Sequence, residues 1–360
     1  MRLIDKADVA RIAVGAAVLG TGGGGDPAIG RLLAEAAIDR YGPVQLIGVD
    51  EVPDDAWVVP SSGMGAPTVS IEKLPSWREI DNSFDDAQVA LGAQPFATMP
   101  IEIGGANALM PLALAARRGI PMVDVDAMGR AFPESQMVSF TLDGMASRFV
   151  CIADEKGNRM TMRPVDAVWQ EVLARPVVDR MGASAMVCDF PVTGVELRRS
   201  GLAGTVSLAQ SIGDALLDPV IHLGNPLGAL LERTRGHRLL TGKIVDLDRT
   251  TAGGFVRGSV TLDGIDADKG RRIVIRFQNE FLLAEENGQP RAITPDLIAL
   301  LDRDSALPWT TESLRYGMRV HVVAMPCHEK WRTPAGIATA GPGYFGYATA
   351  YTPIEQLVKI

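Results

Sequence analysis

The sequence is poor in cysteine and has neither a dense block of basic residues nor a long apolar run. Its three cysteines, Cys151, Cys188 and Cys327, are odd in number and widely spaced, which argues against a disulfide framework and a CxxC metal motif. No apolar stretch approaches the ~18 residues that cross a bilayer. We therefore expect a cytoplasmic protein with no membrane partner.

The charge balance is acidic. Lysine and arginine number 35 against 43 aspartates and glutamates, so the net charge is −8. Nucleic acid is a polyanion that needs a basic surface, so we expect no nucleic-acid partner. Near the N-terminus, Asp5, Asp8 and Arg11 interrupt an apolar segment with helical spacing, and a glycine cluster follows in place of a cleavage site. This indicates a first helix rather than a signal peptide.

What the chain does contain is enough apolar sequence for two domains. It has 360 residues, 47% of them hydrophobic, and a domain usually spans roughly 100–200 residues. We predict an α/β domain over residues 1–168 and a β-rich domain over residues 169–360, with the boundary near 164–180.

The first half alternates helical and strand patterns, which predicts a three-layer α/β domain with some parallel strands. Asp26 is a good N-cap and Pro27 a good first helical residue, so a helix should begin there. The predicted helices span residues 8–19, 27–40 and 108–117. The predicted strands span residues 44–49, 56–60, 120–125, 138–141 and 148–152.

The second half begins with helical patterns over residues 201–217 and 227–234 and then becomes rich in strands. The short turns between these strands include Asn287-Gly288, a strong hairpin signal. We predict a barrel-like or sandwich-like C-terminal domain with a helical lead-in. Its predicted strands span residues 239–247, 253–262, 272–277, 280–284 and 318–325.

Four consecutive glycines, Gly22 to Gly25, form the most conspicuous motif, and Asp26 follows them. Backbone N–H groups before a helix can bind an anion, and the absence of side chains lets a ligand approach closely. No Lys-Ser/Thr pair follows, as a Walker loop requires, and a helix rather than a strand precedes the motif, unlike a dinucleotide fingerprint. We predict a ligand-binding loop; the alternative is a tight connection between two helices.

Two further motifs place polar groups after predicted strands, where α/β proteins often carry their sites. In the first, Glu102 precedes two glycines and Asn107, which could instead cap the next helix. In the second, Asp124 and Asp126 would share one face of a strand and repel each other unless a cation or proton separates them. This favours metal ligation or acid/base chemistry, although Arg130 could pair with one carboxylate and Asp126 could cap a helix.

A fourth motif lies near the C-terminus, where His328 follows Cys327 and precedes Glu329. An imidazole can ligate a metal or shuttle a proton, but the spacing matches no standard zinc motif. Neighbouring side chains on an extended chain point in opposite directions, which disfavours a Cys327 nucleophile activated by His328.

Together these motifs resemble the S-methyl thiohydantoin desulfurase family, whose members often accompany hydantoinase/oxoprolinase-type proteins. The resemblance covers nearly the whole chain, and its specificity lies in the combination of segments. A small residue stands in relatives at the position of Cys327, which is a further argument against a thiol nucleophile. The similar segments are Leu19–Pro27, Glu102–Asn107, Asp124–Glu134, Phe277–Glu280, Trp331–Thr333, Gly341-Pro342 and Phe345–Tyr347.

The resemblance implies an N-terminal three-layer α/β domain, a β-rich C-terminal domain and hydrolytic removal of sulfur from a thiohydantoin-type ring. On this basis we predict a metal-assisted hydrolase of a small cyclic amide or thio-imidate, with a divalent metal such as zinc. The predicted catalytic residues are Glu102, Asp126 and His328. The predicted metal ligands are Asp124, Asp126 and His328. The predicted substrate-binding residues are Gly22, Gly23, Gly24, Gly25, Asp26, Asn107 and Arg130.

Two other functions stay open at this point. The chain could be a non-catalytic partner that binds a ligand or an enzyme of a hydantoinase-like system. It could also be a nucleotide-dependent enzyme that uses the glycine loop, although the missing Lys-Ser/Thr pair weighs against this. We further expect a homo-oligomer, which the composition and charge permit.

Overall fold

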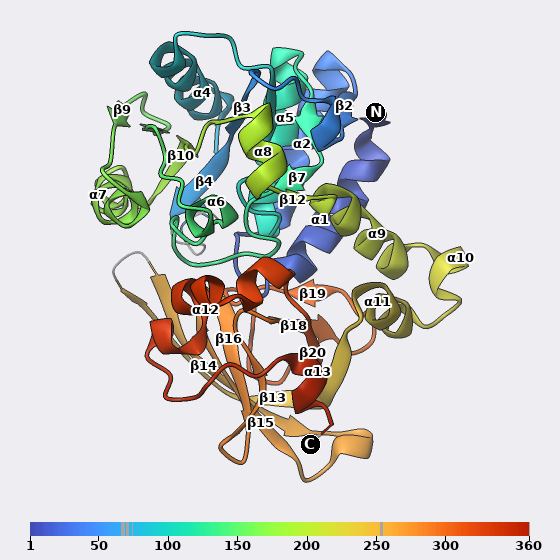
Figure 1. The fold of residues 1–360 in the computed structure, drawn as a ribbon. Coiled ribbons are helices and arrows are strands. Elements are labelled where there is room, and N and C mark those ends of the chain that lie inside the picture. Colours follow the sequence, from blue (N-terminus) through green and yellow to red (C-terminus); the bar gives the residue numbers. More distant parts are fainter. Residues whose placement is uncertain (66–68, 70–71, 74, 253–254, 360) are drawn as a thin grey trace.

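The computed structural model describes residues 1–65, 69, 72–73, 75–252 and 255–359. Figure 1 shows helices and short strands from the first two thirds of the chain gathered above one large sheet from the last third. We call residues 1–234 the α/β part and strands β13–β20 the C-terminal sheet. Among the described residues, no helix combines the length and apolar character that a membrane crossing needs.

A six-stranded mixed sheet forms the centre of the α/β part. Its order is β1-β2-β6-β5-β3-β11, in which β2, β6, β5 and β3 run parallel and the two edge strands run antiparallel. Parallel strands are buried on both faces, as their short apolar runs require. The strands are β1 (Arg2–Ile4), β2 (Val44–Ile47), β3 (Trp57–Pro60), β5 (Ala97–Met99), β6 (Met122–Val123) and β11 (Val192–Thr193).

Helices pack closely around this sheet. Gly15 of α1 and Gly213 of α9 allow the tightest crossing, because a Cβ atom on Gly15 would lie 1.7 Å from the Ala209 carbonyl oxygen. Asp26 caps α2 by accepting a 2.8 Å hydrogen bond from the Ala28 amide, which confirms the predicted N-cap. The helices here are α1 (Lys6–Leu19), α2 (Pro27–Tyr41), α5 (Met110–Arg118), α8 (Gly194–Ser200) and α9 (Thr205–Leu217).

A second, four-stranded antiparallel sheet has the order β4-β10-β8-β9 and lies between two helices. Alternate side chains of β8 and β10 point to opposite faces, so one apolar set packs against α4 and the other against α7. The elements are β4 (Ser62–Gly65), α4 (Trp77–Leu91), β8 (Val150–Ala153), β9 (Arg159–Met162), α7 (Ala167–Arg180) and β10 (Ser184–Cys188).

Strands formed by residues after 168 pair with strands formed by residues before 168: β10 pairs with β4 and β8, and β11 pairs with β3. In addition to β10 and β11, β12 (Leu202–Ala203) pairs with β7 (Val125–Asp126). The division into domains 1–168 and 169–360 stays a prediction, but these pairings join residues up to Ala203 to strands of the first half. The lead-in itself is confirmed: it contains α9, α10 (Pro219–His222) and α11 (Pro226–Thr234).

The C-terminal sheet has eight strands in the order β17-β16-β15-β14-β13-β20-β18-β19, and all neighbours are antiparallel. In the described residues β17 and β19 do not pair, so the sheet does not close into a barrel; the prediction of a β-rich half is confirmed. Asn287 and Gly288 join β16 and β17 with φ angles of 52° and 74°, as a two-residue hairpin requires.

The strands of this sheet are β13 (His237–Ala252), β14 (Phe255–Gly264), β15 (Arg272–Gln278), β16 (Glu280–Glu286), β17 (Gln289–Ile293), β18 (Leu297–Asp302), β19 (Pro308–Trp309) and β20 (Arg319–Met325). The C-terminal segment then adds α12 (Pro334–Ala340) and α13 (Ile354–Leu357). It ties the parts together, because the buried Trp331 donates a 2.6 Å hydrogen bond from its indole to the Met128 carbonyl oxygen.

One predicted strand is wrong: in the segment 138–141, only Val138 is extended, and the other three residues belong to α6 (Ser139–Leu142). The aromatic and β-branched side chains there favour a strand locally. Tertiary contacts decide otherwise, because the Ser139 amide is held at 2.6 Å by the Ala127 carbonyl oxygen and Gly144, with φ of 77°, ends the turn. The amphipathic helix α4, with buried Ile80, Phe84 and Ala87, was not among the predicted elements.

Candidate active site

A pocket of ≈ 140 Å³ lies where the α/β part meets the C-terminal sheet. Its walls come from the glycine loop before α2, from β4 and β10, from the segments that follow β5 and β7, and from the tip between β15 and β16. The volume is close to that of the ~150 Å³ engineered cavity that accommodates benzene. The pocket can therefore hold one small ring.

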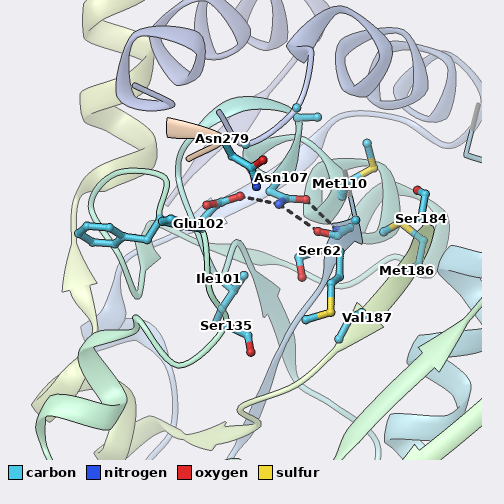
Figure 2. Close-up of a pocket in the computed structure, with 18 of the residues that line it drawn as sticks. Ser62, Ile101, Glu102, Asn107, Met110, Ser135, Ser184, Met186, Val187 and Asn279 are labelled. Atoms are coloured by element: carbon cyan, nitrogen blue, oxygen red, sulfur yellow. Dashed lines mark hydrogen bonds between the residues drawn. The ribbon is translucent and has the colours of Figure 1, made fainter. Parts of the chain in front are cut away.

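Glu102 lies in the wall of this pocket, just beyond the carboxyl end of the parallel strand β5 (Figure 2). Only 5% of the residue is exposed. Burial raises the pKa of the Glu102 carboxyl to about 7, although the hydrogen bond from Asn107 and the charge of Arg130 oppose the rise. A carboxyl group with such a pKa can exchange a proton at neutral pH.

Asn107 fixes the orientation of Glu102. Its Oδ1 accepts a 2.7 Å hydrogen bond from the Gly63 amide, which identifies that atom as the oxygen. Its Nδ2 then donates to Glu102 Oε1 at 2.5 Å and to the Gly63 carbonyl oxygen at 3.2 Å, as the dashed lines in Figure 2 show. The alternative role of helix cap is excluded, because α5 begins at Met110 with Leu109 at its N-cap.

A second buried carboxyl group, that of Glu280 at the start of β16, lines the same pocket. Burial and the nearby charge of Glu102 raise its pKa well above the ordinary range. Its Oε2 atom is buried and has no hydrogen-bond partner among the described residues. A charge on either carboxyl group makes ionisation of the other less favourable, so the two groups titrate as a coupled pair.

The glycine loop packs against the C-terminal sheet and against the second glycine motif. A Cβ atom on Gly22 would lie 2.5 Å from the Phe281 ring, and one on Gly23 would lie 1.9 Å from Glu280 Oε1. Gly24 approaches Gly104 in the same way, at 2.5 Å from its carbonyl oxygen. Close packing with the protein's own hairpin tip therefore requires these glycines. Of the predicted loop residues, Gly24, Gly25 and Asp26 also line the pocket.

Asp126 lies behind the pocket wall rather than in it. It is fully buried, and its Oδ2 accepts hydrogen bonds from the amides of Ile103 at 2.9 Å, Met128 at 3.1 Å and Gly129 at 2.7 Å. Burial raises the pKa of Asp126 to about 7, and these hydrogen bonds oppose the rise. The hydrogen bond from the Ile103 amide holds the chain next to Glu102, so Asp126 positions this segment and does not itself line the pocket.

Arg130 is fully buried and does not line the pocket. Its five N–H groups donate to the carbonyl oxygens of Ala131 at 2.8 Å, Pro295 at 3.1 Å, Asp296 at 3.0 Å and Phe281 at 3.4 Å, and to the Thr21 hydroxyl at 2.7 Å. These contacts connect the glycine loop to the C-terminal sheet. The predicted contact of Arg130 with substrate therefore has no donor left to make it.

The three predicted metal ligands do not converge. Both carboxylate oxygens of Asp124 are held by Ser207, one by its amide at 3.0 Å and the other by its hydroxyl at 2.5 Å. His328 is exposed, and its Nδ1 accepts a 3.2 Å hydrogen bond from the Lys330 amide. Over the described ranges, no three His, Cys, Asp or Glu side chains gather in a way that could hold a metal ion. This donor set does not fit a metal, so we derive no step through one.

Cys327 is buried beside Asp296, whose Oδ1 accepts a 2.9 Å hydrogen bond from its amide. Burial raises the pKa of the Cys327 thiol to about 12. It is therefore protonated at neutral pH, as expected of a residue without a nucleophilic role.

Sequence reasoning assigned no role to several residues that line the pocket. Asn279 and Glu280 form the tip between two apolar strands, and Asn279 adopts a φ of 57°. The polar break Gln278-Asn279-Glu280 between apolar runs is the signal that could have identified them. Much of the apolar wall is formed by methionines, whose flexible thioethers suit a small apolar group. They are Met64, Met110, Met128 and Met186.

Comparisons with known proteins agree with this architecture. A family model described as the S-Me-THD-like N-terminal domain matches residues 7–164, and one described as the S-Me-THD-like C-terminal domain matches residues 165–354. A crystal structure of a protein from Chromobacterium violaceum, a structural-genomics target, superposes with a TM-score of 0.82 at 21% identity, covering 98% of this chain and 100% of that one. This likeness shows a shared fold. No curated protein matches the chain.

Proposed function

The chain belongs to the S-Me-THD-like family, and from that premise we propose that it hydrolyses an S-methyl thiohydantoin-type ring to a hydantoin. The observation that carries the proposal is the buried Glu102, held by Asn107 in the wall of a pocket of one-ring size. A carboxyl group in this position, with its pKa raised to about 7, is suited to general base catalysis at neutral pH.

In the proposed reaction, one water molecule replaces the methylthio group. The water oxygen attacks the ring carbon that carries sulfur, and Glu102 takes a proton from the water. The electron pair of the C=N bond moves to the ring nitrogen, which takes up a proton from solvent. The tetrahedral intermediate then collapses to a carbonyl group: its hydroxyl group releases the second water proton to solvent as the carbon–sulfur bond breaks. Glu102 returns its proton to the departing sulfur, so the products are a hydantoin and methanethiol.

The surrounding residues position these groups. Asn107 holds one oxygen of Glu102 and so fixes the direction in which the carboxyl group meets the water. Asp126 anchors the Ile103 amide next to Glu102. The backbone at Gly24 and Gly25 allows close approach of the flat ring, because neither residue has a side chain. The methionines that line the same pocket accommodate the S-methyl group.

Methanethiol release from a synthetic S-methyl thiohydantoin, followed with a thiol reagent, tests this function. We expect turnover by the wild-type protein and a loss of about 10²–10⁴-fold in kcat for Glu102→Gln, with hydantoin binding retained. Glu329→Gln, which changes an exposed glutamate, is the matched control. A wild-type protein that binds the ring without turnover would favour the non-catalytic alternative, and an active Glu102→Gln variant would remove Glu102 from the mechanism.

A further inference from the structure

The helix α7 covers one face of the second sheet and is apolar on its outer side as well. Its inner side chains Ala174 and Val178 pack against β8 and β10. Figure 1 shows α7 at the margin of the α/β part, on the side of the molecule opposite α10. Apolar side chains recur with helical spacing along the outer side, and each is between 44% and 81% exposed. They are Val165, Val168, Trp169, Val172 and Leu173.

These five side chains, which we call the outer face of α7, have the size of an interface core. A helix that is apolar on both sides is typical of a helix packed on both sides. The outer face measures on the order of 500 Å², which is near the upper end of the apolar patches that monomers expose. A standard interface buries about 800 Å² of each partner and surrounds an apolar core with a polar rim.

Opposite charges lie at the two ends of the outer face. Asp166 is the N-cap of α7, and Arg180 is its last residue. Both are exposed, and neither forms an ion pair with another described residue, whereas Arg175 in the same helix pairs with Glu171. Asp166 and Arg180 are separated by about four helical turns and therefore lie on the same flank of the helix.

This arrangement is complementary to itself. When a twofold axis relates two antiparallel helices, the same flank of each helix faces the other. If the two α7 helices cross near Val172 and Leu173, Asp166 of each copy lies opposite Arg180 of the other copy. The apolar side chains then fill the centre, and the two ion pairs form part of the rim.

A lipid surface fits this helix less well. Helices that lie on membranes carry many lysines and arginines on their polar side, which attract anionic lipids. The charged side chains of α7 and its N-cap show no such excess of basic residues, and the chain has a net charge of −8. They are Asp166, Glu171, Arg175, Asp179 and Arg180.

We propose that the outer face of α7 is the interface of a homodimer in which two α7 helices pack antiparallel about a twofold axis. The occupant is a second copy of this chain because the pattern of the face, acidic at one end and basic at the other, matches itself. The inference does not depend on the proposed function. It does place the interface behind one wall of the pocket, because Arg175 of the same helix lines that pocket.

Sedimentation equilibrium of the full chain tests the interface. We expect a wild-type dimer at micromolar concentration. Val172→Glu puts a charge at the centre of the face and should raise the dimer dissociation constant at least about 100-fold. Val220→Glu, the same change at an exposed valine of α10, is the matched control and should leave the constant unchanged. A wild-type protein that stays monomeric at about 100 µM, with the face free for a different protein, would overturn the proposal, as would a dimer that survives Val172→Glu.

Cysteine substitution tests the antiparallel crossing. The two copies of Val172 lie beside the twofold axis, within the Cα separation of about 4.4–6.8 Å that a disulfide requires. We therefore expect Val172→Cys to form a covalent dimer on mild oxidation. Val168→Cys is the control, because its two copies lie about 15 Å apart at 1.5 Å per residue. The three native cysteines are buried and should not react. Equal yields from the two variants would refute this crossing.

A double-mutant cycle tests the ion pairs at the ends. Arg180→Gln removes one charge, and Asp166→Asn removes the other while keeping an N-cap for α7. Each change should weaken the dimer by about 2- to 10-fold, since an exposed ion pair contributes little and the symmetry supplies two of them. The double variant should be no weaker than either single variant. Independent, multiplying effects would show that Asp166 and Arg180 do not pair and would overturn this register.

Discussion

Glu102 should lower the stability of the folded protein at neutral pH, and Glu102→Gln should relieve this. Its pKa rises from an ordinary value of 4.5 to about 7 on folding because the pocket wall removes water from the carboxylate. The folded state thus favours the protonated form. The stabilising contribution of that form is present below pH 4.5 and is lost as pH rises through 7. The shift corresponds to about 3 kcal/mol.

The assay is urea denaturation at pH 4.5 and at pH 8. Glutamine has the shape of the protonated carboxyl group and keeps an oxygen for the Asn107 Nδ2 donor. We expect Glu102→Gln to unfold at the same denaturant concentration as wild type at pH 4.5 and to be more stable by up to about 3 kcal/mol at pH 8. The exposed control Glu329→Gln should show no such difference. Equal stabilities of Glu102→Gln and wild type at pH 8 would refute the burial argument.

Three further outcomes follow from the site. Asn107→Ala removes a hydrogen bond that favours the Glu102 carboxylate, so kcat should fall about 10- to 100-fold, and the rise of activity with pH should shift to higher pH in a pH–rate profile. Gly23→Ala places a Cβ atom 1.9 Å from Glu280 Oε1 and should destabilise the fold by about 1–3 kcal/mol on thermal melting, whereas Gly343→Ala, with nothing within 4 Å, should not. Incubation with a chelator should leave methanethiol release unchanged, and a loss that added metal restores would contradict the mechanism.

The sequence was most informative where local chemistry decides structure. Asp26 and Pro27 specify the start of α2, and Asn287-Gly288 specifies a hairpin, because both depend on a few adjacent backbone angles and hydrogen bonds. The segment at residues 138–141 shows the limit of this reasoning. Its side chains favour a strand, but contacts with the distant Ala127 carbonyl oxygen turn it into a helix.

The same distinction applies to the site. The motifs at Gly22–Gly25 and Glu102–Asn107 were identified from sequence, and the structure brings both to one pocket. Asp124 and Asp126, which were predicted to bind a metal together, have separate hydrogen-bond partners. Asp124 binds Ser207, and Asp126 accepts hydrogen bonds from three backbone amides. Spacing along the sequence predicts which side chains lie on the same face of a strand. It does not predict which hydrogen-bond donors from other parts of the chain bind those side chains.

The sequence by itself determined the family, the alternation of the α/β part, the strand-rich C-terminal half and the glycine and carboxylate motifs, because each of these is set by local pattern. Only the tertiary structure decided that Glu280, at the tip of a distant hairpin, lies against Gly23 and beside Glu102. The physical reason is that the pKa of a carboxyl group depends on the water it has lost and on the charges around it, and both are properties of the packed molecule.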